Sequence, residues 1–160
     1  MKIIVVSDTH GNVDGFIKEI KNHPDCEMII HLGDYTDDAR KIKNQTDKKL
    51  IFIRGNNDFM DFKAQDEKVI YIKGHKIFLT HGHQYNVYFG LERLAYKAME
   101  VGADLVLFGH SHINVDESYR NIRLINPGST TYPRGGDMRR GFMILDLDES
   151  AINTQRIYLD

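Results

Sequence analysis

The sequence predicts an α/β fold in which buried parallel strands are followed by antiparallel strands. Two observations support this prediction. In the first part of the chain, apolar runs of strand length alternate with helix-like or polar segments, which is typical of βαβ units. In the second part, β-rich runs follow one another with turn residues between them, which indicates antiparallel pairing in a second or mixed sheet.

Three apolar runs in the first part of the chain are the predicted parallel strands. They read KIIVVS, EMIIHLG and KLIFIRG. Between the first two lies VDGFIKEIKN, whose apolar residues have helical spacing, and a polar stretch separates the last two. Because the runs are almost continuously apolar, we expect strands that are buried on both faces.

The second part of the chain begins with a predicted hairpin, KVIYIKGHKIFLTHG, which turns at Gly74 and His75. Apolar residues then recur at helical spacing from Tyr88 to Val101, and Gly102 stands where a helix C-cap is expected. One more buried strand, ADLVLFG, follows. The remaining runs are predicted antiparallel strands: INVDESYRNIRLIN, GFMILDLD and INTQRIYLD.

Composition indicates one domain, residues 1–160, because no stretch of the chain has the character of a linker. No apolar run approaches the ~18 residues of a membrane span, and MKIIVVSDTHG reads as a strand and not as a signal peptide, so we expect a cytoplasmic protein. The single cysteine, Cys26, excludes an intramolecular disulfide and is interpreted as structural. The net charge of −2 does not indicate nucleic-acid binding, although a local patch, PRGGDMRR, could meet a phosphate.

Polar side chains follow the apolar runs directly, at the ends of the predicted strands. These residues are Asp8, His10, Asp34, Asn56, His81, His110 and His112. The carboxyl ends of strands in open α/β sheets form ligand sites, and the glycines at 11, 33, 55, 82 and 109 are expected to allow sharp turns there. The pattern therefore predicts a shared site.

Oxygen and nitrogen donors without a thiolate suit divalent Mn, Fe, Ni, Co or Zn. Seven donors exceed what one four-coordinate ion needs, and they suit two ions that share a bridging carboxylate. Two dications outweigh the two carboxylates in charge, so a hydroxide and a phosphodiester anion would neutralise the pocket. We therefore expect a phosphate ester as the substrate.

Five sequence blocks, DTHGN, GDYTD, GNND, THGH and GHSH, occur in this order between Asp8 and His112. In this order they resemble the calcineurin-like metallophosphoesterase superfamily, and the short chain with its closing NPGS resembles the small phosphodiesterase branch of bacteria and archaea. The resemblance implies a two-sheet, mixed β-sandwich flanked by helices. It also implies hydrolysis of phosphodiester bonds by a metal-bridging hydroxide at a dinuclear centre.

The resemblance assigns the ligands to two ions. Asp8, His10 and His112 would bind the first, Asn56, His81 and His110 the second, and Asp34 would bridge them.

One position departs from the wider superfamily. Many members have a histidine after the ligand Asn, which helps to protonate the leaving oxygen, but this chain has Asn57. An amide cannot supply a proton near neutral pH. Asp58 is then expected to orient the loop, and the proton is expected from His83, from a metal-bound water, or not to be needed when the leaving group is good.

Two residues are candidate substrate contacts, each with a structural alternative. Asn12 could touch the substrate phosphate or cap the first helix, and Arg134 could bind a phosphate or form an exposed salt bridge. The NPGS turn could be only a turn, or its backbone amides could hold a phosphate.

The other histidines are not predicted ligands: His31 is interpreted as a hydrogen-bonded core residue, and His23 and His75 as solvated surface. For the His-x-His pair of FGHSH, we expect Gly109 to turn the chain so that both imidazoles reach the centre.

The predicted function is a metal-dependent phosphodiesterase with a small-molecule phosphodiester substrate, with a homo-oligomer as a possible assembly. A different class of function is a metal-binding protein-protein interaction scaffold, since one eukaryotic relative of this branch acts mainly as a subunit of a sorting complex and has an incomplete metal centre. A phosphomonoesterase or nucleotidase of the same superfamily is the third alternative.

Overall fold

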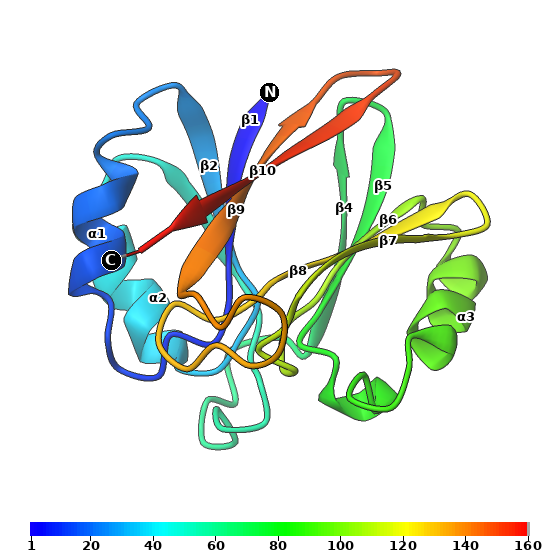
Figure 1. The fold of residues 1–160 in the computed structure, drawn as a ribbon, viewed down its shortest axis with the longest axis horizontal. Helices are drawn as coiled ribbons and strands as arrows, with labels where there is room; N and C mark the ends of the chain where they lie inside the picture. The colour runs from blue at the N-terminus through cyan, green and yellow to red at the C-terminus, as the bar shows by residue number, and fades with distance from the viewer. Residues whose placement is uncertain (160) are drawn as a thin grey trace.

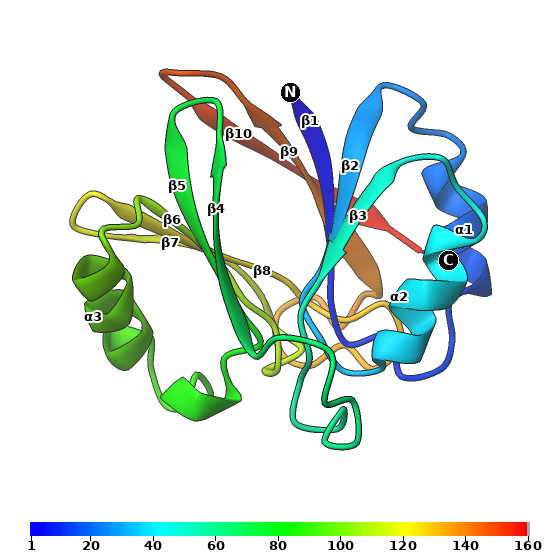
Figure 2. The same cartoon turned by 180° about the vertical axis from the view of Figure 1, so that it is seen from behind.

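Two mixed sheets of five strands each pack against one another in the computed structural model, which describes residues 1–159 (Figure 1). Their strand orders are β10-β9-β1-β2-β3 and β4-β5-β6-β8-β7. Helices lie on the outer side of each sheet, as both views show (Figure 2). The predicted two-sheet, helix-flanked fold is therefore confirmed.

The first sheet has a parallel centre and an antiparallel side. Its elements are β1 (Lys2–Val6), β2 (Cys26–His31), β3 (Lys49–Phe52), β9 (Gly141–Leu147) and β10 (Ile152–Tyr158), with helices α1 (Asp14–Ile20) and α2 (Thr36–Lys43) outside. Helix α2 forms in the polar stretch, for which the sequence pattern indicated no helix. Only a narrow apolar face, with Ala39 and Ile42, is buried beneath its charged residues.

The second sheet has three parallel strands in its middle and an antiparallel pairing, from the predicted hairpins, at each edge. Its elements are β4 (Glu67–Ile72), β5 (His75–Thr80), β6 (Leu105–Leu107), β7 (Asn114–Tyr119) and β8 (Ile122–Pro127), with the 3-10 helix η1 (His83–Tyr85) and helix α3 (Glu92–Val101). Helix α3 starts later than the apolar spacing suggested, after Gly90 with its φ of +146°. It ends at Gly102, which has the expected left-handed conformation.

Alternation along the central strands explains the layers. In β1, Ile3 and Val5 belong to the core between the sheets, whereas Ile4 and Val6 pack with Phe16 of α1. A third apolar cluster joins α3 to the outer face of the second sheet. Cys26 opens β2 as a buried free thiol, in agreement with its interpretation as structural. No helix within residues 1–159 has the length and apolar character that a membrane crossing requires.

His75 is not a solvated surface residue, contrary to the expectation from the sequence. It opens β5 and is buried, with Nδ1 2.5 Å from Asp104 Oδ2 and Nε2 2.8 Å from the carbonyl oxygen of Asp148. The contacts link three segments that are distant in sequence, which a local turn pattern cannot indicate. His23, expected to be solvated surface, is instead partly buried, beside Glu19 and the Phe142 ring. His31 is a core histidine next to Thr9 Oγ1 and the Gly33 amide, as predicted.

Replacing His75 with glutamine is expected to destabilise the protein by about 1 kcal/mol near pH 6 and by less near pH 9. Burial opposes protonation of His75, but the hydrogen bonds with Asp104 and Asp148 and the charges of these two residues together outweigh it and raise the pKa. A raised folded-state pKa stabilises the protein fully below the unfolded value of about 6.5, and this contribution is lost as the pH rises through the folded value. Urea unfolding of both proteins across this range measures the difference; a larger effect at high pH would contradict the assignment.

Candidate metal centre

The carboxyl ends of β1, β2, β3, β5 and β6 meet at one edge of the two sheets, which lies at the bottom of Figures 1 and 2. Parallel strands end on the same side of a sheet, so the residues that follow them share this edge. The loops after these strands carry all the residues that the sequence predicts as ligands.

Four of these residues form a compact group. Asp8, His10, Asp34 and His112 each offer one ligand-type atom, and these atoms lie within 4.8 Å of one another. His112 Nε2 is 3.2 Å from both His10 Nε2 and Asp8 Oδ1, and His10 Nε2 is 3.7 Å from Asp34 Oδ2. The two carboxylates are buried, whereas His10 is partly exposed. This group could hold a divalent ion.

A second group of imidazoles adjoins the first. His81 Nε2 lies 3.4 Å from Asp34 Oδ1, and the His81 ring centroid is 5.2 Å from that of His110. The ring of His83 stands 5.6 Å from His81 and 5.9 Å from His110. Asp34 therefore lies between the two groups, in contact with His10 on one side and His81 on the other.

Asn56 lies on the loop after β3, and its neighbours contact Asp34. The Asn57 amide N–H donates to Asp34 Oδ1 at 3.0 Å, and Asn57 Nδ2 donates to Asp34 Oδ2 at 2.6 Å. On the other side of Asn56, a Cβ added to Gly55 would come within 2.2 Å of Asp34 Oδ1. The loop is thus held against the carboxylate, and the ligand role of the exposed Asn56 itself stays a prediction.

Backbone strain is concentrated at the predicted ligands. Five of them have left-handed backbones with φ between 46° and 66°: Asp8, His10, Asp34, His110 and His112. Each such residue costs on the order of 1–3 kcal/mol, and this kind of strain gathers at functional sites. The turns direct side chains from neighbouring loop positions toward one centre.

Gly109 does not turn the chain in FGHSH, contrary to the prediction. It has no positive φ; His110 and His112 themselves take the left-handed conformation, with φ of 66° and 59°. Gly109 is required for space, because an added Cβ would lie 2.0 Å from Ser7 Oγ and 2.8 Å from Asp8 Oδ2. Gly55 likewise lacks a positive φ, whereas Gly11, Gly33 and Gly82 have one, as expected.

Two buried carboxylates hold the loops of the site. Asp58 accepts the backbone N–H groups of Tyr35, Thr36 and Gly55 at 2.8 to 2.9 Å, which ties the loop after β3 to the start of α2. This is the orienting contact expected of Asp58. The second carboxylate, Asp38, was not singled out from the sequence; its Oδ2 accepts from Thr9 Oγ1 and from the Gly11 amide, both at 2.7 Å. Asp38 lies on α2, which the sequence pattern did not reveal.

The NPGS segment clamps two site loops. Asn126 Nδ2 donates to the Gly109 carbonyl at 2.8 Å, and its Oδ1 accepts from the Gly128 amide. Ser129 Oγ donates to the Asp8 carbonyl at 2.8 Å and accepts from the amides of Thr131 and Tyr132. Both side chains are fully buried, so the segment supports the centre from within the fold.

Neither structural alternative for the two candidate substrate contacts is found. The N-cap of α1 is Val13, without a side-chain cap, so Asn12 does not cap this helix. Within residues 1–159, Arg134 forms no ion pair; its guanidinium donates to the Tyr88 hydroxyl, and the Tyr88 ring lies 5.0 Å from that of His110. Both residues are exposed, and their substrate roles stay predictions.

Hydrogen bonds fix the tautomers of two imidazoles. His81 Nδ1 is 2.7 Å from the Leu32 carbonyl, and His112 Nδ1 is 2.7 Å from the Tyr132 carbonyl. A carbonyl only accepts, so each Nδ1 carries the hydrogen and, in the neutral ring, each Nε2 presents a lone pair to the carboxylates. Asp8 Oδ1 and His81 Nε2 are buried without a hydrogen-bond partner. Such opposed acceptor atoms fit a site for a cation.

The electrostatics of the site keep its acids ionised. Burial opposes the charges of Asp8 and Asp34, but their contacts together outweigh it and lower both pKa values, with His112 and His81 acting on Asp8 and with His81 and Asn57 acting on Asp34. Burial lowers the pKa of His10, and burial beside His81 lowers that of His110 to about 4. The pKa of His81 is raised despite its burial, because Asp34 is adjacent. Metals bind ionised carboxylates and neutral imidazoles, so binding of an ion by His81 requires release of the proton that Asp34 favours on it.

The fold and the residue group together define an α/β protein with a candidate divalent-metal centre. The family model described as the calcineurin-like phosphoesterase superfamily domain matches residues 1–150. The chain belongs to this family, as its sequence blocks predicted.

Curated relatives and solved structures agree with the family. The chain is 36% identical to a probable metallophosphoesterase of Bacillus subtilis, over 99% of this chain and 90% of that protein. It is 33% identical to a phosphodiesterase of Methanocaldococcus jannaschii, over 80% of this chain and 83% of that protein. A predicted phosphoesterase from Streptococcus pneumoniae has a similar crystal structure, with a TM-score of 0.81 and 28% identity over 98% of this chain and 88% of that chain.

Proposed function

We propose that the protein is a metal-dependent phosphodiesterase that uses two divalent ions. The observation that carries this proposal is the position of Asp34, whose two oxygens face His10 at 3.7 Å and His81 at 3.4 Å. A carboxylate between two groups of imidazoles is suited to bridge two ions. Similarity to a phosphodiesterase and to a probable metallophosphoesterase supports the choice of substrate class.

The proposed division of ligands follows the two groups. Asp8, His10 and His112 hold one ion, His81, His110 and Asn56 hold the other, and Asp34 contacts both. Ions such as Mn, Ni, Co, Fe or Zn would lower the pKa of a water to supply hydroxide as the nucleophile and would neutralise charge on the phosphate.

The chain's own residues prepare the centre for this chemistry. The carbonyls of Leu32 and Tyr132 orient His81 and His112 so that Nε2 faces inward. The strained loops and the Asn126 and Ser129 clamp keep the ligands in place without the metals. This rigidity limits the reorganisation needed when an anionic substrate binds.

No strong general acid is proposed for the leaving oxygen, because Asn57 carries an amide that is engaged by Asp34. We therefore expect the rate to fall steeply as the leaving-group pKa rises across a series of aryl and alkyl phosphodiesters. The measurement is kcat/KM for each ester with the metal-loaded protein. A flat dependence would contradict the absence of an efficient acid, and an unchanged rate and pH profile in His83→Ala would exclude His83 as a substitute.

The proposed function is tested by turnover after reconstitution with Mn, Ni, Co, Fe, Zn or Mg. The substrate panel contains bis(p-nitrophenyl) phosphate, cyclic nucleotides, dinucleotides, glycerophosphodiesters and p-nitrophenyl phosphate. We expect hydrolysis of activated diesters with at least one metal and slower hydrolysis of the monoester. Faster hydrolysis of the monoester would favour the phosphomonoesterase alternative, and no turnover with any metal would favour the scaffold.

A further inference from the structure

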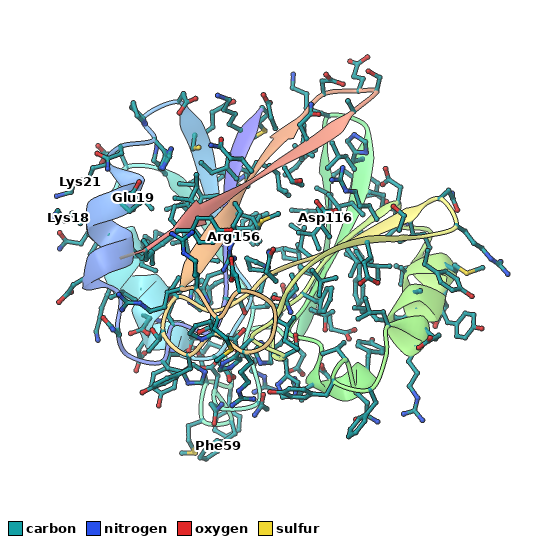
Figure 3. The ribbon with its side chains drawn as sticks, viewed as in Figure 1. Lys18, Glu19, Lys21, Phe59, Asp116 and Arg156 are labelled. Carbon is teal, nitrogen blue, oxygen red and sulfur yellow. The ribbon has the colours of Figure 1, made fainter. Side chains whose placement is uncertain are left out.

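A small cavity of about 180 Å³ adjoins the candidate metal centre and is rich in arginine. His112 forms one part of its lining, and Arg134, Arg139 and Arg156 form much of the rest. The first two arginines belong to the loop that joins β8 to β9, and Arg156 lies on β10. Figure 3 labels Arg156 where its strand passes next to this loop. The cavity and the metal centre thus share His112 as a common wall.

Among the described residues, the cavity lining carries more positive than negative charge. Asp137 is the one acidic residue in the lining. The ion pairs that arginines make within residues 1–159 involve Arg40, Arg54 and Arg123, and none of the three lining arginines. Three arginines against one carboxylate leave a surplus of positive charge in the lining, which attracts an anion.

Arg156 is the least exposed of the three arginines. Its Nη1 is buried without a hydrogen-bond partner, while Nη2 donates to the carbonyl of Arg139 at 3.2 Å. Burial lowers the pKa of this arginine, so its charge is poorly solvated. The Arg139 guanidinium lies 3.6 Å from the Tyr158 ring centroid, a contact that does not neutralise its charge.

The loop backbone leaves this cavity open. Gly135 and Gly136 both have left-handed φ angles, near 60°, and nothing lies within 4 Å of a Cβ built on Gly136. The Arg134 amide donates to the His112 carbonyl at 3.0 Å, which fixes the loop beside the centre. The cavity has the volume of several water molecules, which is enough for one phosphate group.

From this geometry we infer that the cavity binds a second phosphate of the substrate, while the diester phosphate occupies the metal centre. This inference rests on the proposed function and narrows its substrate class. The preferred substrates are phosphodiesters that carry a phosphomonoester on one arm, within reach of Arg139 and Arg156. These arginines act as specificity residues, because they contact a group that does not react.

The test compares two chromogenic diesters with the same leaving group. Thymidine 5′-(p-nitrophenyl phosphate) lacks the second phosphate, and its 3′-phosphorylated form has it. With the metal-loaded protein, kcat/KM is expected to be at least about tenfold higher for the 3′-phosphorylated diester. A ratio of about tenfold is what one additional charge-assisted hydrogen bond in the transition state would give. In Arg139→Gln this ratio is expected to fall toward one.

Two further variants separate recognition from general charge and from folding. Arg93→Gln removes the same charge from the exposed surface of α3 and is expected to keep the wild-type ratio. Arg156→Lys retains the positive charge but not the planar guanidinium, and it is expected to give a ratio between those of wild type and Arg139→Gln.

Binding of inorganic phosphate to the EDTA-treated protein gives a readout that does not need turnover. Phosphate is expected to raise the Tm of wild type and of Arg93→Gln, and to raise that of Arg139→Gln much less. Equal kcat/KM for the two diesters in wild type would overturn the inference whatever the Tm data, and leave the proposed function intact. No turnover of either diester, with a phosphate-induced Tm shift that depends on Arg139, would instead refute the proposed function and retain the anion site.

Discussion

Replacing Asp34 with asparagine is expected to lower kcat/KM for an activated phosphodiester by about 10³-fold, or about 4 kcal/mol. Asp34 presents Oδ2 to His10 and Oδ1 to His81, whereas Asp8 approaches the imidazoles of both groups through Oδ1 alone. The charge of Asp34 is therefore expected to hold both ions. Asparagine keeps the shape of the side chain but has no charge. Both Asp34 oxygens accept hydrogen bonds from Asn57 and are expected to bind metal, and asparagine has only one side-chain oxygen for these roles. Elemental analysis of the purified variant is expected to show reduced metal content.

Asp37→Asn is the matched control for this prediction. Asp37 lies three residues from Asp34, so Asp37→Asn is the same chemical change at a nearby position. The Asp37 side chain is 86% exposed and forms an ion pair with Arg40. Exposed pairs of this kind contribute about 1 kcal/mol or less, so activity and metal content are expected to stay near wild type. Full activity and full metal content in Asp34→Asn would refute the bridging role.

Replacing Gly109 with alanine is expected to destabilise the protein by about 3 kcal/mol and to disrupt the centre. The added methyl group would lie 2.0 Å from Ser7 Oγ and 2.8 Å from Asp8 Oδ2, both on the loop after β1. Ser7 and Asp8 are fully buried, so they have little room to move. Asp8 would be displaced from His112, and urea unfolding together with metal content would measure both effects.

Gly15→Ala is the control for Gly109→Ala, because the same substitution is expected to stabilise the protein at this position. Gly15 lies in α1, with nothing within 4 Å of an added Cβ. Alanine is favoured over glycine inside a helix, so this variant is expected to be more stable by about 0.5–1 kcal/mol. A Gly109→Ala protein as stable as wild type, with normal metal content, would show that the loops can separate at low cost.

The sequence indicated the fold and the location of the site because both depend on local patterns. Apolar runs identified β1, β2 and β3, and the hairpin turn at Gly74 separated β4 from β5. Since strand ends carry the polar residues, even Asp8 and His110, 102 residues apart, could be placed at one edge before any contact was known. In the structure, the His110 amide donates to Asp8 Oδ2 at 3.0 Å.

The errors arose where long-range contacts override local ones. Helix α2 has too few apolar residues to show a periodic pattern, yet Asp58, a residue beyond β3, accepts the amides at its start. His75 is adjacent to a turn glycine but becomes buried because Asp104, just before β6, and Asp148, in the turn between β9 and β10, contact it. Neither partner is close in sequence, so no local signal could have indicated them.

The sequence by itself determined which side chains reach the common edge, since strand period and strand end are local properties of the chain. Only the tertiary structure decided how they converge there. In FGHSH, the expected glycine turn is replaced by left-handed backbones at His110 and His112, while Gly109 is needed because the loop after β1 packs against it. The arginine cavity beside His112 also belongs to the tertiary structure, because β10 brings Arg156 to a loop that ends before it in the chain. Packing between distant segments brings these side chains and their charges together, and the residue spacing within one segment does not encode this arrangement.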